Sequence, residues 1–264
     1  LYKVRYMRYI AGNKFIDALN LSKKLLLKNR IPVINYAVEN NRYTDVFHEY
    51  EYINKHLDDR YRIALKLSSL NYDIKMIDEL IHMYKEKNIK ILIDAENNNN
   101  HDRYNYLMSE LLSEHNKDKC NVLKTYQMYR KDSLRELKDD LKEHKNLGCK
   151  LVRGAYWNSD KKSGNLFMSK IDTDNNYNNG IKLLSGNNSG CNIIATHNNY
   201  SIDLVKYLNN SNLEYGKLLN FNNRKYKEIN NNVNVYIPYG PYFDMIPYLY
   251  RRLYENLDQI KYMS

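Results

Sequence analysis

An α/β barrel of the (β/α)8 type is the fold class that the sequence predicts, and three observations support it. Eight short apolar runs follow one another along the chain. Amphipathic segments with helical spacing lie between them. The nine glycines form neither GxGxxG nor GxxxxGK, which disfavours an open doubly wound sheet with a phosphate-binding turn. Alternating strands and helices imply parallel strands with helical crossovers, and eight of them favour a closed barrel.

The expected strands are the apolar runs themselves, which cover residues 33–38, 63–67, 89–93, 122–126, 150–152, 193–196, 213–219 and 233–237. A helical opening at 14–27 precedes them. Further helices follow from apolar residues three and four apart: Ile74, Ile77, Leu80, Ile81 and Tyr84; Tyr104, Leu107 and Leu111; Leu134, Leu137 and Leu141; Ile202, Val205 and Leu208.

One helix start carries a specific signal, because Ser133 and Glu136 have the spacing of a capping box. We expect a single domain over 1–264, with 1–30 as a helical lead-in and 31–264 as the barrel. A length of 264 residues suits one such barrel or two ordinary domains.

The composition narrows the class of partner. The net charge of +10 would permit a nucleic-acid or acidic-membrane partner, but the basic residues are scattered, so no nucleic acid is expected. Tyrosine outnumbers phenylalanine 27 to 5, and asparagine runs fall where loops are expected. The three cysteines have no metal-ligand spacing, and we expect no metal. No apolar run approaches the ~18 residues of a membrane-spanning helix.

The last expected strand is followed by residues that predict a turn and then a helix. Pro238, Gly240 and Pro241 end the strand, and Asp244 can cap a helix. Arg251 and Arg252 then fall on one helix face, beside Tyr248 and Glu255. Two adjacent guanidiniums can grip a small carboxylate in bidentate fashion. The alternative is a solvated Arg/Glu face, which is common on helices.

Polar residues also follow the other expected strands. The function of a barrel sits at the carboxyl ends of its strands, where these residues would converge. They are Glu39, Lys66, Asp94, Glu96, Gln127, the 150–157 segment KLVRGAYW, Thr196, His197 and Asn198.

These segments resemble the proline dehydrogenase family in the family's own order. The matching pieces are NYAVE at 35–39, LKLS at 65–68, LIDAE at 92–96, TYQ at 125–127, KLVRGAYW at 150–157, Thr173-Asp174 with Tyr177-Asn178, ATHN at 195–198 and the segment 236–256. The resemblance implies a distorted TIM-type barrel whose last helix lies over the carboxyl-terminal mouth. It also implies FAD-dependent oxidation of L-proline to 1-pyrroline-5-carboxylate, by hydride transfer to flavin N5, as the first step of proline catabolism.

The resemblance assigns roles to particular residues. Arg251 and Arg252 would bind the substrate carboxylate with Lys66, while Tyr236 and Tyr248 would pack on the proline ring. Asp94 would order the site as a catalytic residue, and Lys150 would lie near flavin N5. The residues expected to line the FAD are Ile93, Gln127, Arg153, Gly154, Ala155, Thr196 and His197.

The same resemblance implies a quinone-type electron acceptor. It places the protein in the mitochondrion, at the inner membrane or on the matrix side, or at the cytoplasmic face of a bacterial inner membrane. Peripheral membrane association would follow, and the net charge of +10 is compatible with an anionic lipid surface.

The chain departs from the family pattern at its seventh strand. Residues 215–221 read YGKLLNF where the family usually has a sequence like FGQLLGM. The acidic residue often found soon after the tryptophan is displaced to Asp160.

Two alternatives remain open. Lys66 could be the Schiff-base nucleophile of an aldolase-type barrel, with Asp94 as proton shuttle. The protein could also be a degenerate, non-catalytic flavin-binding protein, which Lys217, Asn220 and the asparagine-rich insertions would suit.

Overall fold

The computed structural model describes residues 9–38, 42–187, 190–220, 224–229 and 232–245, and it shows a closed barrel of eight parallel strands. Each strand pairs with the next, and β8 returns to β1, where Val33 lies opposite Tyr236. The predicted barrel is therefore confirmed. The predicted last helix over its mouth lies outside the described residues. The strands are β1 (Arg30–Tyr36), β2 (Arg62–Lys66), β3 (Lys90–Asp94), β4 (Val122–Gln127), β5 (Gly148–Val152), β6 (Asn192–Ala195), β7 (Leu213–Leu218) and β8 (Val233–Tyr239).

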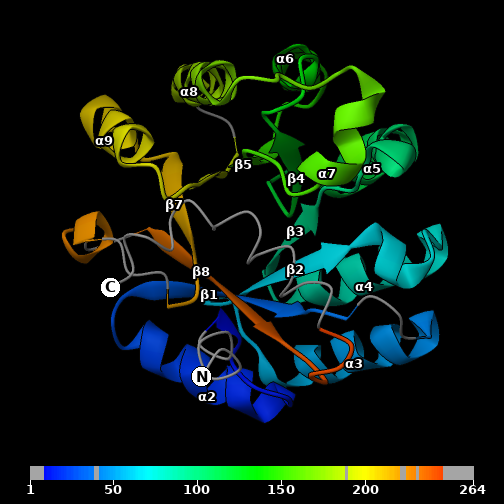
Figure 1. Ribbon diagram of the computed structural model, residues 1–264. Helices are drawn as coiled ribbons and strands as arrows, with labels where there is room; N and C mark the ends of the chain where they lie inside the picture. Colours follow the sequence, from blue (N-terminus) through cyan, green and yellow to red (C-terminus); the bar gives the residue numbers. More distant parts are fainter. Residues whose placement is uncertain (1–8, 39–41, 188–189, 221–223, 230–231, 246–264) are drawn as a thin grey trace.

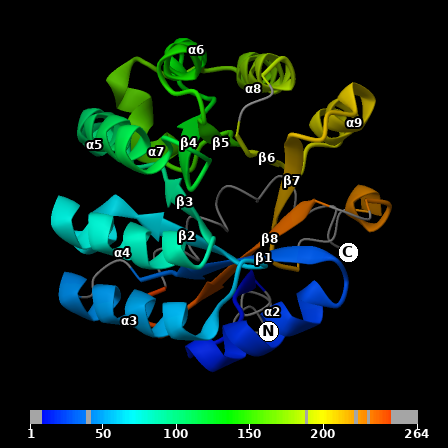
Figure 2. The same ribbon diagram turned by 180° about the vertical axis from the view of Figure 1, so that it is seen from behind.

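Helices form a ring outside the barrel, as the two opposite views show (Figures 1 and 2). Before the barrel, α2 packs Phe15 against Tyr239 of β8, with ring centres 5.9 Å apart. The α-helices are α2 (Phe15–Leu26), α3 (Tyr43–His56), α4 (Ile74–Glu86), α5 (His101–His115), α6 (Ser133–Glu143), α7 (Trp157–Asp160), α8 (Lys170–Ser185) and α9 (Asn199–Leu208). Short 3-10 turns are η2 (Leu67–Leu70), η3 (Asn98–Asn100), η4 (Lys161–Ser163) and η5 (Arg224–Lys227).

The expected capping box at the start of α6 is wrong. The helix begins at Ser133 itself, so this residue does not occupy the N-cap position. Its hydroxyl donates to the Arg130 carbonyl (2.8 Å) and accepts from the Asn176 side chain of α8 (3.0 Å). Glu136 accepts from His101 of α5 (2.8 Å). Both side chains therefore join α6 to its neighbours rather than cap it.

Tyrosine takes the place of phenylalanine in the core between strands and helices. Tyr50, Tyr104 and Tyr177 are almost completely buried. Their hydroxyls donate to strand carbonyls: Tyr50 to Ala64 (2.8 Å), Tyr104 to Ile93 (3.2 Å) and Tyr177 to Leu151 (3.2 Å). A buried hydroxyl is costly unless it finds a partner. Tyrosine can thus replace phenylalanine in this core, because the hydroxyls of the helix tyrosines donate to carbonyl groups of the strands.

The barrel interior is closed at the amino-terminal end of the strands by a polar network. Arg62 of β2 donates two hydrogen bonds to Glu214 of β7 (2.6 and 2.9 Å) and one to Asn234 of β8 (2.7 Å). Burial would raise the pKa of Glu214, but Arg62 holds it below its usual value. Above the network lies an apolar layer formed by Val33, Ala64, Leu92, Leu123, Cys191 and Ile193.

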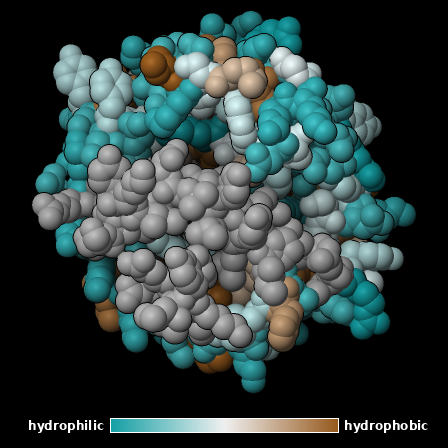
Figure 3. All heavy atoms as spheres, viewed as in Figure 1, coloured by the Kyte–Doolittle hydropathy of each residue, from teal (hydrophilic) through white to brown (hydrophobic). Residues whose placement is uncertain are grey.

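The described surface carries few large apolar side chains together. On the face shown in Figure 3 the described side chains are mostly hydrophilic, and the hydrophobic ones form separate spots. None of the described helices combines the length and the apolarity that a membrane crossing needs.

Candidate active site

A cavity of about 300 Å³ opens above the apolar layer, at the carboxyl end of the barrel. All eight strands contribute to its wall, several through their last residue, as with Lys66, Asp94, Gln127 and Ala195. Its described lining contains five basic side chains and one carboxylate, Asp94. The basic residues are Lys66, Lys150, Arg153, Lys170 and Lys217. Such a wall fits a ligand with several negative charges.

Asp94 is the centre of a three-residue cluster. Its Oδ1 accepts from Lys150 Nζ (2.5 Å) and its Oδ2 from the Tyr236 hydroxyl (2.6 Å). Lys150 Nζ also lies 5.0 Å from the centre of the Tyr236 ring. The alternation of strand side chains explains the placement, because Leu92 and Asp94 both point into the barrel. Residues from β3, β5 and β8 therefore meet around one carboxylate.

The charge states of this cluster follow from its surroundings. Burial would raise the pKa of Asp94, but Lys150 and the hydrogen bonds from Lys150 and Tyr236 hold it below its usual value. Lys66 lies in register with Asp94 on the adjacent strand. Burial would lower the pKa of Lys66, yet Tyr156 and Glu96 raise it above its usual value. At neutral pH Asp94 is therefore ionised and Lys66 is charged.

Arg153 forms the second cluster, on the β5–β6 side. Its guanidinium donates to Asp174 of α8 (2.6 Å), to Thr196 after β6 (2.7 Å) and to Ser201 of α9 (3.1 Å). The same guanidinium lies 4.2 Å from the centre of the Tyr177 ring. Burial would raise the pKa of Asp174, but Lys170 and Arg153 lower it. Arg153 is thus fixed in place by three elements.

The loop after β5 depends on Gln127 and Gly154. Gln127 donates to the Glu96 carbonyl (2.8 Å) and accepts from the Ala155 amide (3.4 Å). Gly154 has a φ of +136°, and a Cβ there would lie 2.1 Å from the Tyr129 ring. Glycine is therefore required here, because the Tyr129 ring occupies the space that a Cβ would need.

The wall beside Arg153 has the features of a phosphate site. Thr196, His197 and Asn198 precede α9 and line the cavity. The amino end of a helix favours negative charge. Lys217 of β7 lines the same wall, and burial and the nearby Arg30 lower its pKa. These donors fit the pyrophosphate of a dinucleotide such as FAD.

The structure brings most of the sequence-predicted site residues together. Those that line the cavity are Lys66, Asp94, Gln127, Lys150, Arg153, Gly154, Ala155, Thr196, His197 and Tyr236. Tyr248, Arg251 and Arg252 lie outside the described residues, as does Glu39. Ile93 is not among the residues that line the cavity, because its side chain alternates with those of Leu92 and Asp94 and packs in the outer core.

Sequence reasoning missed two lining residues and misjudged a third. Tyr156 lies within the resembling KLVRGAYW segment but received no role, although its ring centre is 5.5 Å from Lys66 Nζ. Lys170 was missed because it begins α8, whose first turns bury Thr173 and Asn176 rather than apolar side chains. Lys217 was noted only as a departure; it lies two residues after Tyr215, on the same face of β7, and its Nζ lies 5.6 Å from the centre of the Tyr226 ring.

Asp160 is fully buried and lies at the edge of the same loop system. It accepts from the Tyr129 hydroxyl (2.7 Å) and from the Asn98 amide (3.0 Å). The displaced acidic residue of the sequence therefore joins the loop after β5 to the loop after β3 through Asn98 and to the loop after β4 through Tyr129.

Comparisons with known proteins agree on one family. The family model described as proline dehydrogenase matches residues 20–264. The mitochondrial proline dehydrogenase 2 of Arabidopsis thaliana is 34% identical over 200 residues, which cover 65% of this chain and 42% of the plant protein. The probable mitochondrial proline dehydrogenase of Schizosaccharomyces pombe is 30% identical over 163 residues, 58% of this chain and 32% of the yeast protein. The chain thus spans less than half the length of these relatives.

A comparison with solved structures finds a protein with the same barrel architecture. The structure of proline utilization A from Bdellovibrio bacteriovorus superposes with a TM-score of 0.84 at 18% identity. The match covers 95% of this chain and 32% of that protein. At this identity the likeness establishes the shared barrel.

Proposed function

Because the chain belongs to the proline dehydrogenase family, we propose that it oxidises L-proline to 1-pyrroline-5-carboxylate with FAD as cofactor. The observation that carries the proposal is the cavity at the carboxyl end of the barrel, whose described lining contains five basic residues and one acidic residue, Asp94. A substrate carboxylate and a cofactor pyrophosphate would use these charges in two different places.

The substrate carboxylate is assigned to Lys66. Its raised pKa keeps the ammonium charged at neutral pH, and Lys66 lines the cavity in register with Asp94. Arg251 and Arg252, outside the described residues, would complete the carboxylate site from above, and Tyr248 would pack on the proline ring. Bidentate guanidinium contacts would fix the orientation of the substrate.

Asp94 would act by ordering the site. It holds Lys150 and Tyr236 on separate oxygens, so neither side chain can move without breaking a charged hydrogen bond. The Lys150 ammonium then stands where negative charge would develop during the reaction, and a preorganised cation stabilises such charge. The Tyr236 ring would offer an apolar edge to the proline ring.

FAD would be held by Gln127, Arg153, Gly154, Ala155, Thr196 and His197, with Lys170 and Lys217 adding positive charge. When bound, it accepts the hydride that no protein side chain can accept. The chain itself supplies orientation: three hydrogen bonds hold Arg153, and the amino end of α9 faces the same wall.

The aldolase alternative is less well supported. A Schiff-base lysine must be deprotonated to attack, and such lysines have lowered pKa values. The pKa of Lys66 is raised instead, and Asp94 is occupied by Lys150 and Tyr236. The charge around Lys66 therefore suits anion binding rather than nucleophilic attack.

The decisive experiment follows flavin colour. The chain is purified with FAD, and L-proline is added anaerobically while the flavin absorbance is recorded. Proline-dependent bleaching supports the proposal. A yellow protein that proline does not bleach would identify a non-catalytic flavin-binding protein, and a colourless protein would reopen the aldolase reading.

The two arginines can be assigned with the same assay. Arg251→Met and Arg252→Met should each raise the proline concentration needed for half-maximal bleaching by at least tenfold, because a charged contact to the carboxylate is lost. The flavin content should stay unchanged. Lys75→Met, on the exposed side of α4, is the matched control for loss of one positive charge. Loss of colour in the arginine variants would place them on the cofactor side.

We also propose a quinone-type electron acceptor and a mitochondrial location on the inner membrane or matrix side, or the equivalent bacterial membrane face. The support is that the yeast and plant relatives are named mitochondrial. Residues 1–264 would act as one domain, with 1–30 as the lead-in.

A further inference from the structure

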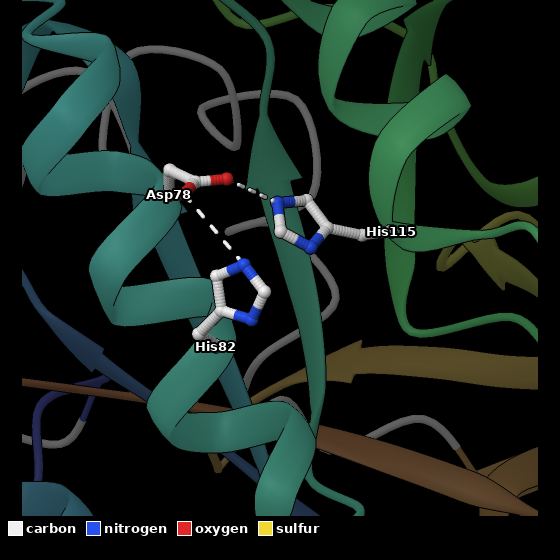
Figure 4. A group of neighbouring side chains, drawn as sticks. All are labelled: Asp78, His82 and His115. Atoms are coloured by element: carbon white, nitrogen blue, oxygen red, sulfur yellow. Dashed lines mark hydrogen bonds and ion pairs between the residues drawn. The ribbon is translucent and has the colours of Figure 1, made fainter.

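Two histidines and an aspartate face one another on the outside of the barrel, between α4 and α5 (Figure 4). His115 Nε2 lies 2.9 Å from Asp78 Oδ1, and His82 Nε2 lies 3.7 Å from Asp78 Oδ2. The two imidazole rings meet edge to face, with centres 5.0 Å apart. Each residue offers one possible ligand atom, and these three atoms lie within 4.8 Å of one another.

The backbone fixes this arrangement. Asp78 and His82 are four residues apart on α4, so both project from one face of the helix. His115 is the last residue of α5, and its carbonyl accepts from the Asn121 side chain (2.6 Å). The next residue, Asn116, accepts from the Val122 amide (2.9 Å) and so ties this helix end to β4.

His115 is oriented as a ligand. Its side chain is fully buried, whereas those of Asp78 and His82 are 44% and 54% exposed. Nε2 is the nitrogen that faces Asp78, at 2.9 Å, whereas Nδ1 has no hydrogen-bond partner among the described residues. His115 is therefore held in a fixed position, while Asp78 and His82 face solvent, from which a cation can enter.

Two other described clusters each hold one histidine and two carboxylates, and in each a carboxylate is already bound by a cation. Beside His101 and Glu136, Asp132 is bound by Arg130 (3.3 Å) and by the Asn165 side chain. Beside His144, Asp140 is bound by Lys124 (2.6 Å). A cation that already neutralises the carboxylate opposes a metal ion. The hydrogen bonds and ion pairs described for Asp78 involve the two histidines, so this cluster has the strongest claim.

We propose that Asp78, His82 and His115 bind a divalent metal ion of the Zn²⁺ class, with solvent as the fourth ligand. Ligands about 2.1 Å from a tetrahedral Zn²⁺ lie roughly 3.4 Å from one another. The two distances from the Asp78 carboxylate lie on either side of this value. Two imidazoles and a carboxylate are also a ligand set that suits zinc.

The site stands apart from the proposed chemistry. His115 ends α5 and is followed closely by the start of β4, so the cluster lies toward the amino-terminal side of the barrel. The cavity opens at the opposite, carboxyl side. The metal ion would therefore join α4 to α5 and stabilise the fold without contacting substrate.

Zinc binding by the full chain tests the proposal. The protein is stripped with a chelator, returned to chelator-free buffer at pH 7.5 and titrated with Zn²⁺ against a chromophoric competitor. We expect one Zn²⁺ per chain at this site and a rise of the melting temperature with added Zn²⁺. His82→Ala should weaken the binding at least tenfold and abolish the thermal shift, while its melting temperature in chelator stays that of the unaltered chain.

Matched variants separate metal binding from simple helix packing. Asp78→Asn can still accept a hydrogen bond from His115 but is a poor metal ligand, so it should fold and lose the thermal shift. His48→Ala removes an exposed histidine that pairs with Glu51 (2.7 Å), and it should bind Zn²⁺ as before. Equal affinity and equal thermal shift in the unaltered chain and in His82→Ala would overturn the proposal.

Discussion

At the scale of single residues, Asp94 shows how one carboxylate can order a site. Both of its oxygens are engaged, one by Lys150 and one by Tyr236. The side chains of Asp94 and Lys150 are mostly buried, so each charge depends on the other for compensation. The hydrogen bonds fix both the ammonium and the phenol relative to the strand ends.

Removing that carboxylate should destabilise the whole domain. In Asp94→Asn the Lys150 ammonium remains buried without its counter-charge, and we expect a loss of about 3 kcal/mol in the free energy of unfolding. Urea unfolding of the cofactor-free chain at pH 7 measures it. Asp139→Asn, which removes an exposed partner of Lys142, is the control and should cost less than about 1 kcal/mol. Equal losses in both variants would contradict the expectation.

The same residue predicts a pH dependence. The pKa of Asp94 is lower in the folded chain than in the unfolded chain. Its contribution is therefore fully present above the ordinary carboxyl pKa of about 4 and is lost as the pH falls through the lower, folded value. The difference in unfolding free energy between the unaltered chain and Asp94→Asn should stay constant from about pH 5 to 8 and shrink below about pH 4. Unfolding curves at each pH test this, and a gap that persists undiminished into strong acid would refute it.

The residues Ile93 and Asp94 at the end of β3 show which single-residue positions could be predicted from the sequence and which could not. Asp94 was placed correctly because a charged residue that ends an apolar strand must find water or a partner. Ile93 was misplaced because family resemblance assigns residues along a segment, whereas a strand sends neighbouring side chains to opposite faces. Applying the alternation to each resembling segment would have corrected it.

At the scale of elements, strands were predicted more accurately than helices. All eight strands were found because a barrel strand buried on both sides is a continuous apolar run. Three α-helices were not predicted: α3, α8 and the four-residue α7. In α3 the buried face is Val46, Phe47, Tyr50 and Ile53, interleaved with many polar residues. In α8 the buried apolar residues Tyr177, Ile181 and Leu184 begin only in the middle of the helix, and the first turns bury Thr173 and Asn176.

The loop after β5 offers a prediction about glycine. Gly154 and Gly164 both have positive φ, +136° and +73°, but a Cβ at Gly164 would have no atom within 4 Å, whereas one at Gly154 would overlap the Tyr129 ring. Gly164→Ala should therefore cost about 1 kcal/mol from backbone strain. Gly154→Ala should cost at least about 2 kcal/mol more, because Tyr129 must move. Urea unfolding measures the loss of unfolding free energy in each variant. Equal losses would mean that the Tyr129 ring can move aside at no cost.

At the scale of the whole molecule, a buried ion pair closes the barrel. Arg62 and Glu214, with Asn234, join β2, β7 and β8 inside the barrel near the amino-terminal ends of these strands. This link connects strands that are far apart in sequence. It could not be read from the sequence, because nothing in a single strand tells which distant strand faces it across the interior.

Breaking that pair should affect stability and leave the proposed site intact. Glu214→Ala leaves Arg62 buried and uncompensated, so we expect a loss of about 3 to 5 kcal/mol. The double variant Arg62→Met/Glu214→Leu should be more stable than either Arg62→Met or Glu214→Ala, because no unpaired charge remains. Unfolding free energies test both statements. In the molecules that remain folded, the proline concentration for half-maximal flavin bleaching should not change.

The candidate site as a whole was predictable because its residues lie at strand ends and in resembling segments. The barrel then brings separate segments to one mouth, which the order of strands alone implies. What could not be predicted were the partners, such as Asp174 with Arg153 or Asp160 with Tyr129. Those pairs depend on loop paths that the strand pattern does not determine.

The chain contains one tryptophan, Trp157, among 27 tyrosines. It begins α7 next to the cavity-lining Tyr156, half-buried, with its ring centre 6.5 Å from that of Tyr129. Excitation at wavelengths that only indole absorbs will therefore yield an emission signal from this corner of the rim alone. The unaltered polypeptide carries an optical reporter placed where ligands would enter, so occupancy can be followed without attaching a dye.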